Sequence, residues 1–195
     1  MKILFDYNIF SHQKLGGISR YFINLHKYMN RYQDVNCKIF TPIHFNKFLK
    51  SYKDKKNNHF YLKDYPKFTR KLINFFNYSS SKIYCKYFKP DIIHKTFFNY
   101  NFDNNKKTKK VITVYDLIHE IYHNDFNRSD NYLPKKNFLN IVDSIICPSY
   151  KTKNDLIHFY NIKPEKISVI YMGINEFNDT KELELSNKLK PYLLY

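Results

Sequence analysis

Two adjacent glycines, Gly16 and Gly17, stand where a short apolar run gives way to an amphipathic segment, and this arrangement is suited to binding an anion. The run at 2–7 has the length of a buried strand, whereas residues 18–29 carry apolar side chains at helical spacing. Without Cβ atoms, the backbone at this junction can adopt positive φ angles and a ligand can approach it closely. The following helix directs free N–H groups and its positive dipole end to the same place. The sequence therefore predicts a phosphate site, to which Arg20 could add a charge-assisted contact; a tight turn without a ligand is the alternative.

A second set of polar side chains follows other predicted strands and could contact a ligand at the same edge of the sheet. These candidates are His94, Thr96, Tyr115, Asp116, His119, Glu120 and Ser149. A histidine beside carboxylates can hydrogen-bond a hydroxyl or accept a proton, so Asp116 and His119 are the catalytic candidates. Structural alternatives remain open for several of them: a lone histidine is often a core residue, and Ser149 is suited to cap a helix.

The elements that must position these residues alternate along the chain. Strands are predicted at 2–7, 35–40, 91–94, 111–115, 144–147 and 167–171. Helices are predicted at 18–29, 67–88, 132–142 and 151–160; in the second of these we expect one face to hold Leu72, Phe75, Phe76, Ser79, Ile83 and Phe88. Residues 42–64, with a charged loop at 53–58, and the basic segment 101–110 are expected to be irregular. Nearly continuous apolar strands between helices indicate an α/β fold with a doubly wound parallel sheet, whose ligands bind beyond the carboxyl ends of the strands.

The net charge of +16 raises the question of an anionic partner. Of the 33 basic residues only four are Arg, and proteins that read nucleic acid favour Arg for bidentate contacts. Ala and Trp are absent while Lys, Asn, Ile, Phe and Tyr are abundant, which is the composition that an AT-rich coding sequence produces. We therefore expect no nucleic-acid partner. We attribute most of the positive charge to the AT-rich coding sequence, and the alternative is that it attracts the protein to an anionic membrane surface.

The three cysteines, Cys37, Cys85 and Cys147, are far apart and show no metal-ligand spacing. Two of them fall in predicted strands, so buried structural thiols in a reducing cytoplasm are expected. No apolar run reaches the roughly 18 residues that a membrane span requires, and we expect no signal peptide at the start of the chain.

Five segments in this order and spacing resemble the N-terminal half of family 4 glycosyltransferases, the retaining enzymes of the two-Rossmann (GT-B) type. They are FD at 5–6 with GGISRYF at 16–22, PDIIH at 90–94, VITVYDLIHE at 111–120, DSIICPS at 143–149 with KTKNDL at 151–156, and KISVIYMGI at 166–174. The resemblance covers nearly the whole chain.

This resemblance implies a Rossmann-like acceptor-side domain at 1–188 and, at 189–195, the start of a donor-binding domain whose remainder, with its paired glutamates, is not in this sequence. It implies transfer of a sugar, with retention and without a metal or other cofactor, from a nucleotide-diphosphate sugar to a glycan or lipid-linked acceptor. The expected setting is cell-surface polysaccharide or lipopolysaccharide synthesis, in the cytoplasm or at the inner face of the membrane. This chain alone is expected to be inactive.

Residue by residue, the resemblance assigns the donor phosphates to Gly16, Gly17 and Arg20, and the transferred sugar to the region of Asp116 and His119. The chain departs from the family where many members have a histidine directly at the end of the 111–115 strand, since Tyr115 stands there instead. Other classes remain as alternatives: a non-catalytic anion- or glycan-binding half-domain, or an inactive gene remnant. A Rossmann oxidoreductase is disfavoured, because the first turn lacks the G-x-G-x-x-G pattern.

Overall fold

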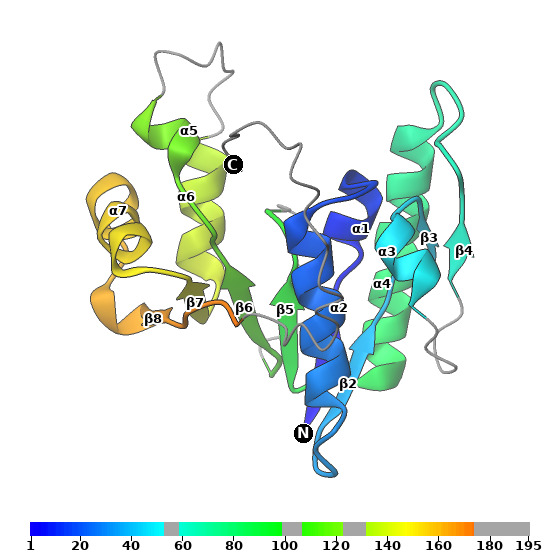
Figure 1. The fold of residues 1–195 in the computed structure, drawn as a ribbon, viewed down its shortest axis with the longest axis horizontal. Helices are drawn as coiled ribbons and strands as arrows, with labels where there is room; N and C mark the ends of the chain where they lie inside the picture. Colours follow the sequence, from blue (N-terminus) through cyan, green and yellow to red (C-terminus); the bar gives the residue numbers. More distant parts are fainter. Residues whose placement is uncertain (53–58, 99–106, 123–131, 174–195) are drawn as a thin grey trace, which may run out of the picture.

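The computed structural model describes residues 1–52, 59–98, 107–122 and 132–173, which form a six-stranded parallel sheet flanked by helices (Figure 1). The strand order is β2-β1-β5-β6-β7-β8. The strands are β1 (Lys2–Phe5), β2 (Asn36–Ile39), β5 (Ile92–Lys95), β6 (Lys109–Thr113), β7 (Ser144–Cys147) and β8 (Ile167–Val169). The doubly wound α/β fold and all six strands predicted from the sequence are thereby confirmed. The predicted loop at 53–58, residues 101–106 of the loop predicted at 101–110, and the segment 189–195 lie outside the described residues. Lys109 and Lys110 belong to β6, so the prediction of a loop as far as residue 110 was wrong.

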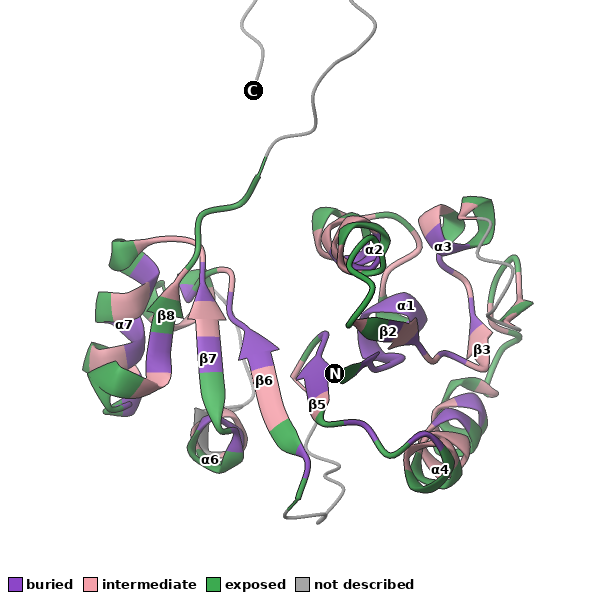
Figure 2. Cartoon of the chain, turned by 90° about the horizontal axis from the view of Figure 1, so that it is seen from below, coloured by how far each residue is buried: buried purple, intermediate pink, exposed green. Residues whose placement is uncertain are grey.

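Helices cover both faces of this sheet, as Figure 2 shows. On one face, α2 (Gly17–Met29) and the short α1 (Asn8–His12) pack on Ile3 and Phe5 of β1. On the other, α4 (Arg70–Phe88) packs on Leu4 of β1, while α6 (Tyr132–Ile141) and α7 (Tyr150–Tyr160) share a core with β6, β7 and β8. The alternation of side chains along each strand separates these cores. The predicted helices are confirmed to within three residues at each end.

Short elements were not predicted, because each is too brief to show a period. They are α1, β3 (Ile43–His44), α3 (Lys47–Ser51), β4 (Phe60–Tyr61), α5 (Ile118–Ile121) and the 3-10 turn η1 (Pro164–Lys166). β3 and β4 form a separate two-stranded parallel sheet, with Ile43 opposite Phe60. The expectation that residues 42–64 are irregular throughout was therefore wrong.

The predicted orientation of α4 was also wrong. Of the side chains assigned to its common face, only Phe88 is buried; Leu72, Phe75, Phe76 and Ile83 are exposed. The face that packs inward holds Ile73, Asn77 and Phe88. Asn77 belongs there because its amide binds the backbone of β3: it accepts a hydrogen bond from the N–H of Ile43 at 3.0 Å and donates to its carbonyl oxygen at 2.9 Å.

Cys37 and Cys147 are buried free thiols, as predicted. Burial raises the pKa of the Cys37 thiol to about 12, which keeps it protonated and unreactive at neutral pH. Within the part of the chain that the structure describes, no helix is long and apolar enough to cross a bilayer.

Candidate functional site

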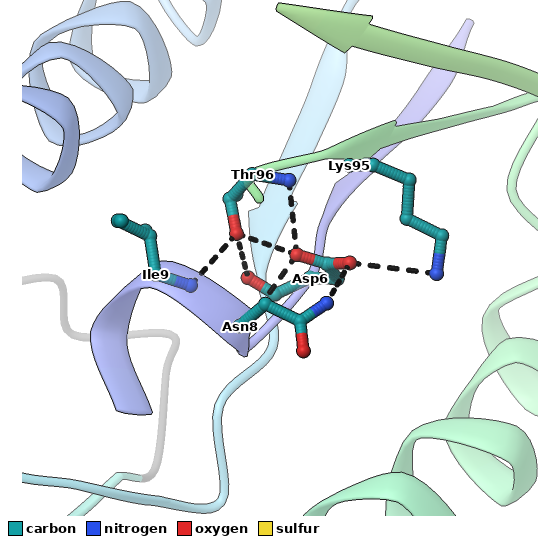
Figure 3. Close-up of polar contacts among 5 residues, drawn as sticks. All are labelled: Asp6, Asn8, Ile9, Lys95 and Thr96. Atoms are coloured by element: carbon teal, nitrogen blue, oxygen red, sulfur yellow. Dashed lines mark hydrogen bonds and ion pairs between the residues drawn. The ribbon is translucent and has the colours of Figure 1, made fainter. Parts of the chain in front are cut away.

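The switch point of the sheet lies between β1 and β5, because the chain leaves β1 toward β2 on one side and later continues from β5 toward β8 on the other. Asp6 follows β1 directly and is 7 % exposed. Its Oδ1 accepts hydrogen bonds from the Thr96 hydroxyl at 2.5 Å and the Thr96 N–H at 3.0 Å, and its Oδ2 accepts one from the Asn8 amide at 2.6 Å (Figure 3). The ammonium of Lys95 lies 3.4 Å from Oδ2. A single buried carboxylate thus holds the strand ends and the start of α1 together.

The glycine loop lies at the same edge of the sheet and opens α2. Gly16 precedes the first turn in an extended conformation (φ 175°), and no glycine in the described part of the chain adopts the left-handed conformation that glycine permits. The two glycines differ in how much free space surrounds them. A Cβ atom at Gly17 would meet no atom within 4 Å, so the backbone there can be approached from solvent.

The side chain of Gln13 occupies the space beside Gly16. A Cβ atom on Gly16 would lie 2.3 Å from Gln13 Oε1, and the same oxygen accepts a long hydrogen bond of 3.4 Å from the N–H of Ser19. An amide oxygen therefore satisfies a helix N-terminal donor of the kind that binds phosphates. Arg20 is exposed on the first turn of α2.

Tyr21 on α2 joins the glycine loop to the end of β6. Its ring packs edge-on against that of Tyr115, with centroids 5.8 Å apart. Burial raises the pKa of both phenols, so both stay protonated at neutral pH. The Tyr115 hydroxyl is buried without a hydrogen-bond partner among the described residues. This contact places the residues that follow β6 beside the start of α2.

Asp116 and His119 come next along the chain. Asp116 is exposed, and its Oδ1 accepts a hydrogen bond of 3.3 Å from the N–H of Ile118, which begins α5. His119 is half-buried on α5. Both therefore lie at the carboxyl edge of the central strand, as the sequence predicts, and their contact with a sugar stays a prediction.

The carboxylate of Glu120 is engaged in an ion pair. Its carboxylate bonds the ammonium of Lys135 on α6 and accepts a hydrogen bond of 2.6 Å from the Tyr160 hydroxyl on α7. Burial opposes ionisation, but the bonds to Lys135 and Tyr160 outweigh it and lower the pKa of Glu120. Glu120 thus anchors α5 to two helices instead of offering a free carboxylate to a ligand.

His94 and Thr96, two more of the predicted sugar contacts, have structural roles. His94 is 4 % exposed, packs edge-on against the rings of Phe5 and Phe22, and bonds the Thr113 hydroxyl through Nε2 at 2.9 Å. Its burial lowers its pKa to about 4, so it is neutral. Thr96 is 1 % exposed. Its hydroxyl and N–H donate hydrogen bonds to Asp6, and its hydroxyl oxygen accepts one from the N–H of Ile9.

Ser149 caps α7, as its structural alternative predicted. Its hydroxyl oxygen accepts a hydrogen bond of 3.1 Å from the N–H of Thr152. The Thr152 hydroxyl in turn contacts the carbonyl oxygen of Tyr115 at 3.4 Å, which ties the start of α7 to the end of β6.

Sequence reasoning missed Asp6, His12 and Gln13 as site residues. Asp6 could have been found, because it follows a buried strand just as Asp116 does. His12 ends α1 beside the glycine loop, where its ring packs on Phe97 and Nδ1 lies 3.5 Å from the guanidinium of Arg70. Partial burial and the charge of Arg70 lower the pKa of His12, which favours the neutral imidazole. It lacked a sequence signal because α1 was not predicted.

A pocket of about 40 Å³ lies between α4 and the ends of β1 and β5, bordered by Asp6 and Lys95. This volume is far smaller than the roughly 300–1,000 Å³ of pockets that hold small-molecule ligands. No cluster of three or more metal-ligating side chains occurs among the residues with described positions.

The strand order, the glycine loop at a helix start and the polar edge beyond β1, β5 and β6 define a Rossmann-like domain of the GT-B glycosyltransferase kind. The sequence model of Glycosyltransferase Family 4 matches residues 15–176, so the chain belongs to that family. A comparison with curated protein sequences finds no significant match.

Solved structures of similar fold include a glycosyltransferase from Rickettsia africae ESF-5, with 17 % identity and a TM-score of 0.55 over 89 % of this chain and 43 % of that one. The lipopolysaccharide outer core galactosyltransferase WaaB in its apo form is 18 % identical, with a TM-score of 0.54 over 89 % of this chain and 46 % of that one. The UDP-GlcNAc 2-epimerase from Neisseria meningitidis, bound to UDP-GlcNAc, is 14 % identical, with a TM-score of 0.57 over 87 % of this chain and 45 % of that one. The chain therefore spans less than half the length of each.

Proposed function

We propose that this chain is the acceptor-side half of a retaining glycosyltransferase that moves a hexose from a nucleotide-diphosphate sugar to a glycan or lipid-linked acceptor. The observation that carries the proposal is the family match over 15–176, which includes the glycine loop, the edge beyond β6 and α7. An epimerase shares the fold, so the fold alone supports nucleotide-sugar chemistry in general, and the family match favours transfer.

In this proposal the start of α2 faces the donor diphosphate. Gly17 lets the phosphates approach the backbone, Arg20 adds a positive charge, and the Gln13 amide leaves the helix end when the phosphates arrive. Asp116 and His119 lie beyond β6, where they bond hydroxyls of the transferred sugar or accept the proton of the acceptor. Glu120, His94, Thr96 and Ser149 hold the elements that carry these groups.

The proposed setting is cell-surface polysaccharide or lipopolysaccharide synthesis in the cytoplasm or at the inner membrane face. The galactosyltransferase among the similar structures acts on lipopolysaccharide outer core, which supports this choice. We propose further that residues 1–195 alone do not catalyse sugar transfer, since most stabilisation of the leaving diphosphate would come from groups outside this sequence.

Nucleotide binding tests the proposal without requiring turnover. The 195-residue chain is titrated with UDP, GDP, the monophosphates and the nucleosides, with calorimetry or NMR as the readout. We expect weak binding that increases with the number of phosphates and is lost in Gly17→Val. Gly173→Val is the matched control, because a Cβ atom there also meets no atom within 4 Å.

Transfer is then assayed with a panel of nucleotide-sugars and membrane-extracted acceptors. Diphosphate binding that is unaffected by Gly17→Val, or the absence of any phosphate preference, would contradict the assignment of the site. Diphosphate binding without transfer even when a family donor domain is supplied would favour the non-catalytic binding module. Donor-dependent product from the chain alone would overturn the proposed division of labour.

A further inference from the structure

Helix α4 presents an apolar stripe to solvent. Its large exposed apolar side chains, with their exposed fractions, are Leu72 (68 %), Phe75 (65 %), Phe76 (51 %), Ile83 (71 %) and Tyr87 (85 %). At 100° per residue, Leu72, Phe76, Ile83 and Tyr87 fall within about 60° of one another, and Phe75 lies beside them. Phe68, just before the helix, is 99 % exposed. The stripe therefore runs along the whole helix, which is about 28 Å long at 1.5 Å per residue.

This stripe does not serve the core of the domain. A different side of α4, centred about 100° around the helix axis from the stripe, packs inward through Ile73, Asn77 and Phe88. The other long helices that are described in full differ: α2 exposes one large apolar side chain, Tyr28, and so does α7, Tyr150. Scattered exposed apolar residues are normal on a protein surface, but five on one helix face mark a binding surface.

The charges around the stripe identify the kind of partner. Between Pro66 and Lys89 the sequence has no Asp or Glu. Lys71, Lys82 and Lys86 lie on one side of the row formed by Leu72, Phe76, Ile83 and Tyr87, at the angular position of Phe75. The Lys82 ammonium lies over the Tyr78 ring at 4.6 Å. Exposed Phe and Leu beside a row of lysines is the pattern of a helix that lies in a membrane interface, with its apolar side among acyl chains and its lysines at anionic headgroups.

We propose that the outer face of α4 docks the protein onto an anionic lipid surface. Arg70 begins this helix and reaches His12 at the carboxyl edge of the sheet, so the docked helix starts beside the candidate site. A lipid-linked acceptor at the surface would then be near that edge, a consequence that rests on the proposed sugar transfer. The docking of α4 onto lipid is independent of that proposed function.

Vesicle binding of the 195-residue chain tests the docking. Co-sedimentation is measured with phosphatidylcholine vesicles that contain or lack phosphatidylglycerol, at low and high salt. We expect binding that requires phosphatidylglycerol and weakens with salt. The variant L72S/F76S/I83S should lose about tenfold in affinity, and K71Q/K86Q about as much.

Matched controls replace equally exposed residues elsewhere. Y32S/Y150S/Y171S removes three apolar side chains with exposed fractions of 64–70 %, and K27Q/K163Q removes two exposed lysines. Both should stay within about twofold of the parent affinity, because they are remote from α4.

A fluorescent reporter keeps the test decisive if a triple variant fails to fold. The chain has no Trp, so Phe76→Trp introduces a single one on the stripe. Its emission should shift to the blue with anionic vesicles, whereas that of Tyr150→Trp should not. Equal binding to neutral vesicles, equal losses in the controls, or no blue shift would overturn the proposal. A parent dimer that L72S/F76S/I83S converts to monomer would overturn it in favour of a second copy of the chain. None of these outcomes bears on nucleotide binding.

Discussion

Asp6 and Thr96, 90 residues apart in the sequence, join the ends of β1 and β5 through a side-chain hydrogen bond of 2.5 Å. The Thr96 hydroxyl also accepts a hydrogen bond from the N–H of Ile9, so the same pair fixes the start of α1. The loop that leads to Gly16 begins at the end of that helix. The geometry of the candidate phosphate site therefore depends on a contact made at the switch point of the sheet.

Removing the Asp6 carboxylate is expected to cost about 3–5 kcal/mol of unfolding free energy, because Asp6→Ala removes the negative charge that lies 3.4 Å from the buried Lys95 ammonium. Thr96→Val should cost about 1–3 kcal/mol, because it leaves buried polar groups unsatisfied. Urea unfolding of the two single variants and the double variant measures the coupling. Additive losses would contradict a direct interaction.

Tyr160→Phe is expected to lower the unfolding free energy by about 1–3 kcal/mol, because the buried Glu120 carboxylate loses a hydrogen bond of 2.6 Å. Tyr150→Phe, at a tyrosine that is 64 % exposed, is the control and should stay within about 0.5 kcal/mol of the parent. Denaturant unfolding measures both. Equal effects at the two positions would show that the Glu120 bond does not stabilise the domain.

Stability should fall below about pH 6.5 because of His94. Burial lowers its folded-state pKa to about 4, below the unfolded value of 6.5, so the unfolded state takes up the proton first as the pH decreases. The stabilisation is complete above about pH 6.5 and is lost progressively toward about pH 4, at a cost of about 2 kcal/mol by pH 5. His44, whose pKa is also lowered to about 4 by burial and by His59, adds in the same direction.

Urea unfolding at about pH 7.5, 6 and 5 tests this titration through the slope of stability against pH. His94→Gln should remove about half of that slope, whatever its effect at neutral pH. Leu72→Ser, an exposed substitution that alters no titratable group, should leave the slope unchanged. A slope that is unaltered in His94→Gln would show that His94 is not the titrating group.

The two glycines should differ in what they tolerate. Gly16→Ala is expected to cost about 1 kcal/mol, because alanine is a poor N-cap and its Cβ would displace the Gln13 amide from Ser19. Gly17→Ala should be neutral or stabilise the fold by up to about 1 kcal/mol, since its Cβ points into open space.

Thermal and urea unfolding of both variants, each with and without Gln13→Ala, tests the explanation. In the absence of the Gln13 amide, part of the Gly16→Ala cost should disappear. If Gly16→Ala lowers stability equally with and without Gln13→Ala, the poor N-cap alone explains the loss and the contact with Gln13 does not contribute.

The sequence by itself determined the strands of the sheet, its main helices and the doubly wound fold, because short apolar runs and helical spacing are local properties of the sequence. It also placed Gly17, Asp116 and His119 at one edge, since the carboxyl ends of parallel strands converge there. Tertiary structure alone decided which groups are already engaged. Glu120 is bound by Lys135 and Tyr160, and such partners come from distant segments.

The orientation of α4 shows the same division. Its sequence has apolar residues on two sides, and local periodicity favours the more apolar side as the core. The structure turns that side to solvent because Asn77, on the other side, binds the backbone of a strand that begins 34 residues earlier. A long-range hydrogen-bond pattern of this kind cannot be predicted from the helix alone, and it leaves the apolar stripe available to a partner.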